Sequence, residues 1–171
     1  MEISFFKSAM AKNNALIDTD EFFEKVRTGT WKSEISALRS CLKDNGKDVY
    51  NKKKKLLNAV TLSGNFNGRT ELIEYSGLIQ GDIDSVENPE LLRDELSLDP
   101  HVRASFLSPS GQGVKLAIKV PPDPELHREY FAFAQEYFLT KYGVIIDTSC
   151  KDINRLLFVS YDEDIKGNEE C

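Results

Sequence analysis

The chain has 171 residues, 40% of them hydrophobic and 29% charged, which is enough for one globular domain with a sizeable core. It contains no apolar run near the ~20 residues of a membrane helix and no apolar leader followed by a cleavage site. The net charge of −6 argues against a strongly basic DNA-binding surface, but it does not exclude nucleic acid, because metal-binding carboxylates add to the negative count.

The cysteines predict neither a disulfide framework nor a zinc site. Cys41, Cys150 and Cys171 are odd in number and far apart, and no two have Cys-x-x-Cys spacing. This usage favours a reducing cytoplasm. The chain stops directly after its last strand-like segment, so we expect it to be a piece of a longer protein.

The first third of the chain is expected to be mostly helical. An amphipathic stretch over Glu21–Arg27 precedes Gly29, and Trp31–Leu42 places its apolar residues on one face before Gly46. The basic run Lys52–Lys55 has two interpretations. A solvated helix face is the more frequent one for such a run, and a phosphate-contacting patch is the alternative.

From residue 59 onward, strands predominate. The expected strands are Ala59–Ser63, Leu72–Tyr75, Gly77–Asp84, Ala104–Leu107, Val114–Val120, Val144–Asp147 and Leu156–Ser160. One helix should begin at Asn88-Pro89 and run to about Ser97, and a longer one should begin at Asp123-Pro124 and end at Gly143.

The order of these elements predicts the fold class. From residue 77 it is β-α-β-β-α-β with an extra strand, which indicates an α+β fold with a ferredoxin-like split βαβ core and helices on one face of an antiparallel sheet. We therefore expect a single domain over residues 1–171, with a mostly helical part at 1–58 and the core at 59–165.

Two acidic residues lie at the end of an expected strand. Asp82 and Asp84 are two residues apart, so both should share one face of the sheet while Ile83 points into the core. Adjacent carboxylates repel each other unless a cation lies between them, and such oxygen ligands suit Mg²⁺ or Mn²⁺. A solvated strand end is the alternative for this short motif.

A glycine-containing turn follows at residues 108–115. Gly111 and Gly113 would let the backbone approach a ligand, Ser110 adds a hydroxyl, and Lys115 adds a positive charge, which together suit a triphosphate. The alternative is a plain β-hairpin whose glycines serve the turn.

A third carboxylate ends an apolar segment. Asp147 closes Val144–Asp147, and if that strand lies beside the strand of Asp82 and Asp84, the three carboxylates would form a two-metal site. Alternatively, Asp147 caps the turn that follows it. Arg155, further on, could clamp a phosphate or pair with one of these aspartates, and a structural salt bridge is the other interpretation.

These motifs together resemble those of the archaeo-eukaryotic primase superfamily, namely Asp82-Ile83-Asp84, Ser110-Gly111-Gln112-Gly113-Val114-Lys115 and Ile146-Asp147 with Arg155 downstream. The wider pattern is similar to the primase-polymerase-like N-terminal domain of virulence-associated E proteins, and it covers roughly residues 55–165. The stretches that carry it are Ala59–Gly64, Phe106–Gly111, Lys151–Arg155 and Phe158–Asp162. Lys115 departs from the superfamily, which has histidine there.

The resemblance implies a nucleotidyltransferase that acts in DNA replication of a bacterium or mobile element. Asp82, Asp84 and Asp147 would hold Mg²⁺ or Mn²⁺, and Ser110, Gly111, Gly113, Lys115 and Arg155 would bind the triphosphate. The partners would be a nucleoside triphosphate, single-stranded or primed DNA, and a helicase domain in the full-length chain, with no membrane. Two alternatives are a catalytically inactive DNA-binding or helicase-recruiting module and a metal-dependent nuclease.

Overall fold

The structure is a computed structural model and describes residues 1–168. Its strands are β1 (Glu2–Phe6), β2 (Ala15–Asp18), β3 (Ala59–Thr61), β4 (Gly64–Asn67), β5 (Glu71–Tyr75), β6 (Leu78–Ile83), β7 (Val102–Leu107), β8 (Val114–Lys119), β9 (Leu157–Phe158) and β10 (Lys166–Gly167). Its helices are α1 (Thr19–Thr28), α2 (Lys32–Lys54), α3 (Pro89–Leu96) and α4 (His127–Tyr142), with 3₁₀ turns η1 (Pro124–Leu126) and η2 (Thr148–Lys151).

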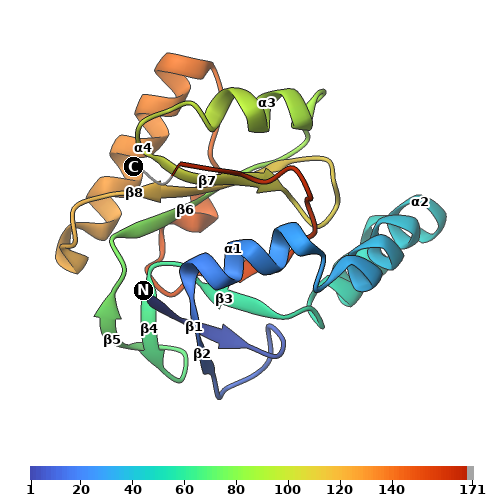
Figure 1. Cartoon of the computed structure of the whole chain (residues 1–171), viewed down its shortest axis with the longest axis horizontal. Coiled ribbons are helices and arrows are strands. Elements are labelled where there is room, and N and C mark those ends of the chain that lie inside the picture. Colours follow the sequence, from blue (N-terminus) through green and yellow to red (C-terminus); the bar gives the residue numbers. More distant parts are fainter. Residues whose placement is uncertain (169–171) are drawn as a thin grey trace.

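The strands of the described chain form sheets in the orders β2-β1-β3-β9, β10-β7-β8-β6 and β4-β5. In Figure 1, α3 and α4 lie on one side of the β10-β7-β8-β6 sheet, and α1 with the β2-β1-β3-β9 sheet lies on the other. The predicted α+β class, with an antiparallel sheet, is therefore confirmed.

Each face of the β10-β7-β8-β6 sheet contributes to a separate core. Val114, Leu116 and Ile118 alternate along β8 toward α4, where they pack in one cluster with Phe131 and Phe138. Ala117, between Leu116 and Ile118 on β8, belongs to the other cluster together with Phe106 of β7. That cluster also includes residues of α1, α2 and the β2-β1-β3-β9 sheet. The period of two in a strand sends alternate side chains to these two cores.

The N-terminal part contains strands that the sequence analysis did not predict. β1 pairs antiparallel with β3, with Phe5 opposite Val60, and β3 pairs with β9, with Ala59 opposite Phe158. The expected division between residues 58 and 59 therefore runs through one sheet. Strands of four or five residues, such as β1 and β2, carry too few alternations to stand out beside the helical pattern that follows them.

Trp31 anchors this N-terminal part. It is 5% exposed, and its ring centroid lies 6.4 Å from that of Phe5 and 6.0 Å from that of Phe22. Its indole Nε1 donates a hydrogen bond to Asn58 Oδ1 over 2.9 Å, which satisfies the polar end of a buried ring.

The predicted helices are present, with one difference in α2. Gly29 ends α1 in the left-handed conformation, and Gly143 ends α4 in the same way, as expected. Gly46 also interrupts the helical backbone, with φ 77° and ψ 179°, but a second helical stretch continues from there to Lys54. The basic run at 52–55 thus lies on and just after the end of α2.

The predicted strand Val144–Asp147 is wrong. Helix α4 ends at Tyr142 with Gly143 as its cap, and Asp147 is already the N-cap of η2. The segment between these two caps is therefore too short to form a strand with its own ladder of backbone hydrogen bonds. The segment nevertheless runs beside β6, because the Asp147 N–H donates to the carbonyl of Asp82 over 2.8 Å. A Cβ at Gly81 would lie 3.4 Å from Ile146 Cδ1, an ordinary packing distance, so Ile146 lies directly against β6.

The last expected strand is shorter than predicted. Only Leu157–Phe158 of Leu156–Ser160 form a strand, β9, and it joins β3. Cys41 and Cys150 are buried free thiols, and Cys171 lies outside the described residues. No helix within residues 1–168 is long and apolar enough to cross a membrane.

Candidate functional site

Asp82 and Lys115 form a partly buried ion pair at one end of the sheet. They lie opposite each other on β6 and β8, and Lys115 Nζ is 2.7 Å from Asp82 Oδ1. The side chain of Lys115 is 3% exposed and that of Asp82 is 19% exposed, so the carboxylate keeps an open side. Ile83 is buried in the core that faces α4, which confirms the predicted alternation, whereas Asp84 is exposed and lies beyond the end of β6.

Asp147 has its own hydrogen-bonding partners and also adjoins Asp82. Its carboxylate accepts hydrogen bonds from the backbone N–H of Ser149 over 2.9 Å and from Ser149 Oγ over 2.6 Å. These bonds, together with the positive charges of Arg155 and Lys115, hold the pKa of Asp147 below its ordinary value. The predicted capping role is therefore confirmed. The hydrogen bond from the Asp147 N–H to the Asp82 carbonyl places this cap at the edge of β6.

Arg155 is linked to Asp147 through Ser149. Its guanidinium NH2 donates to Ser149 Oγ over 2.9 Å, so Arg155, Ser149 and Asp147 form a hydrogen-bonded chain. The side chain of Arg155 is exposed, which leaves most of its donors free for a ligand. One end of the sheet thus carries both carboxylates and cations.

The glycine-containing turn has the hydrogen bonds of a hairpin. The N–H of Ser108 donates to the carbonyl of Gly113 and the N–H of Gly111 donates to the carbonyl of Ser108, both over 2.8 Å. The N–H of Gln112 donates to Ser110 Oγ over 3.2 Å. The amides of Gly111 and Gln112 are therefore used within the turn, and the hairpin interpretation is confirmed for them.

The two glycines are required for local reasons. Gly111 has φ 73°, a conformation that other residues rarely adopt. A Cβ at Gly113 would lie 2.4 Å from the carbonyl oxygen of Ile83, so only glycine lets β6 and the turn pass this close. The turn is thereby placed next to the end of β6, where Asp84 follows.

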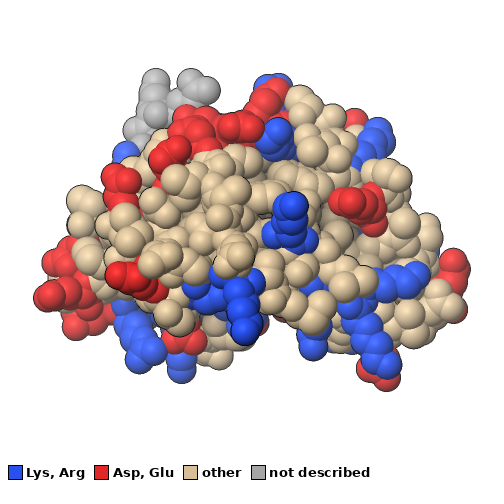
Figure 2. All heavy atoms as spheres, turned by 90° about the horizontal axis from the view of Figure 1, so that it is seen from below, with Lys and Arg blue, Asp and Glu red and all other residues tan. Residues whose placement is uncertain are grey.

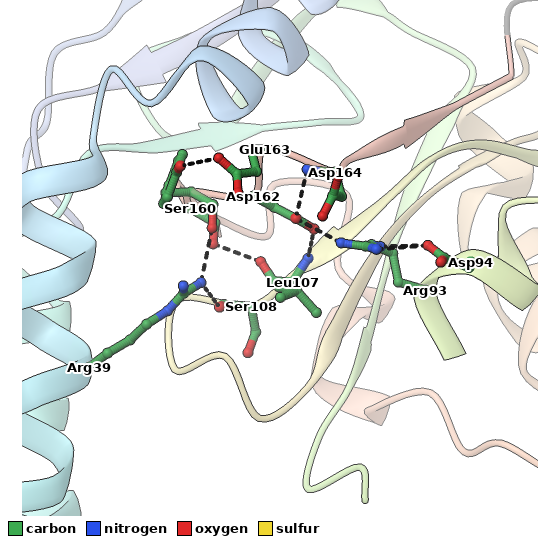
Figure 3. A network of polar contacts seen from close by, with 10 residues as sticks. Arg39, Arg93, Asp94, Leu107, Ser108, Ser160, Asp162, Glu163 and Asp164 are labelled. Atoms are coloured by element: carbon green, nitrogen blue, oxygen red, sulfur yellow. Dashed lines mark hydrogen bonds and ion pairs between the residues drawn. The ribbon is translucent and has the colours of Figure 1, made fainter. Parts of the chain in front are cut away.

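The turn is held from α2 by Arg39. Its guanidinium donates to the carbonyls of Pro109 and Ser108, both over 3.3 Å, and to the carbonyl of Tyr161 over 3.0 Å. Figure 3 shows Arg39 reaching from its helix to these two segments. Burial lowers the pKa of Arg39, because the charge is partly removed from water.

A second part of this network fixes the strand that leads into the turn. Asp162 is 5% exposed and accepts hydrogen bonds from Arg93 NH1 over 2.8 Å and from the Leu107 N–H over 2.9 Å. Ser160 Oγ donates to the Leu107 carbonyl over 2.7 Å (Figure 3). Residues from α3, β7 and the segment after β9 therefore hold the start of the turn rigidly.

Two residues of α2 also reach this place. Tyr50 was not predicted, whereas Lys54 belongs to the basic run Lys52–Lys55, for which phosphate contact was one of the two interpretations. Burial raises the pKa of Tyr50, and the neighbouring Ser110 side chain opposes this effect. Burial and the charge of Lys115 lower the pKa of Lys54, and the charges of Asp82 and Asp84 oppose this effect. Positions 50 and 54 share one helix face, so the i,i+4 spacing was a signal that could have found them.

The carboxylates match a hard cation in ligand type, although they are not gathered into one ligand set. Asp82, Asp84 and Asp147 offer oxygen ligands, which Mg²⁺ and Mn²⁺ prefer. Asp82 Oδ1 is paired with Lys115 and Asp147 is bonded to Ser149. Within residues 1–168, no group of three or more His, Cys, Asp or Glu side chains is arranged to hold a metal ion.

Comparison with known families corrects the predicted resemblance. The model of the BT4734-like, N-terminal domain matches residues 51–166, and this is a different family from the primase-polymerase-like domain of virulence-associated E proteins. The predicted membership of that family was therefore wrong. No curated protein and no solved structure matches the chain.

Proposed function

The chain belongs to the family of BT4734-like N-terminal domains, and for its site we propose metal-dependent nucleotidyl transfer from a nucleoside triphosphate to a nucleic-acid end. The observation that supports this proposal is the backbone hydrogen bond from Asp147 to Asp82. It brings two acidic segments together beside Lys115 and Arg155, and a triphosphate with its metal ion needs this combination of carboxylates and cations.

The cations of the site would bind the triphosphate. Lys115 is buried and would act as a fixed point charge, whereas exposed Arg155 would offer a planar fork of donors to phosphate oxygens. Ser110, Gly111 and Gly113 would form the wall of the site, and Ser110 would offer its hydroxyl. Because Arg39 fixes that turn, the wall would stay in place when the nucleotide arrives.

The carboxylates would hold the metal ions. Asp82, Asp84 and Asp147 are the proposed ligands of Mg²⁺ or Mn²⁺. A bound ion of this kind supplies Lewis-acid stabilisation of the negative charge that develops on the phosphate. The open side of Asp82 and the exposed carboxylate of Asp84 are the acceptors best placed to receive it.

The wider context is also part of the proposal. The element order β6-α3-β7-β8-α4, with residues 144–147 beside β6, is the order of a split βαβ unit, and we infer a ferredoxin-like core. The proposed partners are single-stranded or primed DNA and a helicase domain in a longer chain, in DNA replication in the cytoplasm of a bacterial cell.

Nucleotide incorporation on a primed single-stranded template with Mn²⁺ tests this function. We expect Asp82→Asn to reduce incorporation by at least about a hundredfold, the scale of losing one group that stabilises developing charge. Asp44→Asn is the matched control, because it removes one exposed carboxylate from α2 and should leave the rate unchanged. A folded wild-type protein that incorporates no nucleotide would contradict the proposal.

A second candidate is a nonenzymatic module that binds DNA or nucleotides. The observation that favours it is the Asp82–Lys115 ion pair, which already neutralises one of the carboxylates that a metal would need. Such a module should bind DNA equally well in the presence of EDTA and after Asp82→Asn. Incorporation that depends on Asp82 would exclude it.

A further inference from the structure

A groove of about 490 Å³ lies between the end of α2, the β4–β5 turn and the segment that leads into β9. Lys55 lines it from the end of α2, Arg69 from the turn, and Arg155 from the segment before β9. These residues are far apart in the sequence, so the fold alone brings the three cations together. Asn154 Nδ2 donates to the Arg69 carbonyl over 2.9 Å and joins two of the walls.

The groove is lined by three cations, and within its described part the structure records no close ion pair for any of them. Among residues 1–168, Lys55, Arg69 and Arg155 form no ion pair within 4.0 Å. The carboxylate in the lining is Asp152, and its Oδ1 is 2.8 Å from Arg128 NH2 at the rim. Three cations that line one groove repel one another, and a bound polyanion would relieve this repulsion.

Arg69 is held in position before any ligand arrives. Its guanidinium lies 4.9 Å from the ring centroid of Phe6, and its NH1 donates to the Ala9 carbonyl over 3.3 Å. These contacts use one face and one donor of a group that has five N–H donors. The remaining donors are available to phosphate oxygens.

The groove continues into the candidate site. Arg155 belongs to both, because it lines the groove and donates to Ser149 beside Asp147. Lys54 Nζ lies 5.2 Å from the ring centroid of Phe158, which lines the groove, and the charges of Asp82 and Asp84 act on the same ammonium. A ligand in the groove would therefore have one end at the carboxylates.

The surface charges of the molecule are unevenly distributed. Figure 2 shows the underside of the molecule, where Lys and Arg predominate along one long side and Asp and Glu along the opposite side. The chain as a whole has a net charge of −6. A concentration of cations in an acidic protein indicates a specific anionic ligand rather than a generally basic surface.

We propose that this groove binds a single nucleic-acid strand, with its phosphates on Lys55, Arg69 and Arg155 and a base against Phe158, and that it directs the strand end to the carboxylate site. The aromatic residue favours a strand with unstacked bases over an acidic peptide, because bases stack on aromatic rings and carboxylate side chains do not. This inference rests on the proposed function, since it locates the nucleic-acid substrate of that same site.

The test is binding of a fluorescently labelled oligothymidylate in EDTA without nucleotide, measured by anisotropy over a range of salt concentrations. We expect Lys55→Ala/Arg69→Ala to weaken binding about tenfold, and the slope of log K against log[salt] to fall by about 0.7 for each phosphate that the variant no longer neutralises. Phe158→Leu should weaken binding while leaving the slope unchanged, because it removes stacking and no charge.

Lys43→Ala/Lys47→Ala is the matched control, because it removes the same charge from exposed positions of α2 that do not line the groove. Equal weakening in the control, or competition by polyglutamate as strong as by oligothymidylate, would overturn the inference. Normal binding by a groove variant would also overturn it, even if Asp82→Asn abolishes incorporation and the proposed function stands. Conversely, groove variants that lose binding in a protein without incorporation would uphold the groove and refute the proposed function.

Discussion

Two ion pairs in this molecule differ in how completely they are satisfied. In the first, Asp162 accepts hydrogen bonds from Arg93, the Leu107 N–H and the Asp164 N–H, and Arg93 also contacts Asp94. In the second pair, one carboxylate oxygen of Asp82 contacts the ammonium of Lys115, and the Asp82 side chain remains 19% exposed. The Arg93 and Asp162 side chains are 5% and 4% exposed.

The difference separates a structural pair from a pair with capacity for a ligand. A charge inside a protein is tolerated when its hydrogen-bonding groups are satisfied, and Asp162 meets this condition. Asp82 meets it in part, because one side of its carboxylate faces solvent and could accept further hydrogen bonds or a cation. The following variants test this comparison, from the largest expected effect to the smallest.

Asp162→Ala should cost the most stability. It leaves the Arg93 guanidinium buried without its main partner and removes the acceptor of the Leu107 N–H, and breaking a buried pair on one side costs about 3–5 kcal/mol. Urea unfolding measures this loss. The matched control is Asp94→Ala, whose carboxylate contacts the same arginine at the surface and should cost less than about 1 kcal/mol. Equal losses in the two variants would show that burial does not set the cost.

Lys115→Met should have a smaller effect on stability and a specific effect on binding. Asp82 loses its partner but keeps its open side, so we expect a loss of about 1–3 kcal/mol in the free energy of unfolding. Nucleoside triphosphate affinity should fall about tenfold or more, as expected for the loss of one charged hydrogen bond. Calorimetric titration measures that affinity, with Lys47→Met as the control for a lost surface charge. Unchanged affinity would remove Lys115 from the proposed site.

Asp147→Asn should have the smallest effect, about 0.5–1 kcal/mol, because asparagine keeps part of the cap. Its signature is a dependence on pH. The folded pKa of Asp147 lies below its unfolded value, so the wild-type advantage should be complete above about pH 4, shrink as the pH falls below that value, and be lost as the pH falls through the folded pKa. Urea unfolding at pH 7 and pH 3 compares the two proteins. An advantage as large at pH 3 as at pH 7 would contradict this explanation of the lowered pKa.

Features with a local cause were predictable from the sequence. The glycine caps of α1 and α4 depend on residues next to the helix end, and the burial of Ile83 beside Asp82 depends only on the period of a strand. The class of the fold followed from the order of such elements. The capping role of Asp147 was likewise one of the two interpretations that its neighbours allowed.

Features that depend on distant contacts were not predictable. The segment Val144–Asp147 has the composition of a strand, but the positions of α4 and η2 leave it too little length. Arg39 gave no signal, because the carbonyls that it binds lie 69 to 122 residues away in the sequence. The family resemblance failed for a related reason, since short motifs such as Asp-x-Asp and Gly-x-Gly also arise where a strand end and a hairpin need them.

Trp31 gives the molecule a built-in optical reporter. It is the single tryptophan of the chain and lies in the core formed by α1, α2 and the β2-β1-β3-β9 sheet, whereas the core against α4 contains tyrosine and phenylalanine. Its emission should therefore shift to the red when the first core opens, without responding directly to the second. Combined with circular dichroism, which follows all the helices, this signal would reveal whether the two cores of one sheet unfold together or in sequence.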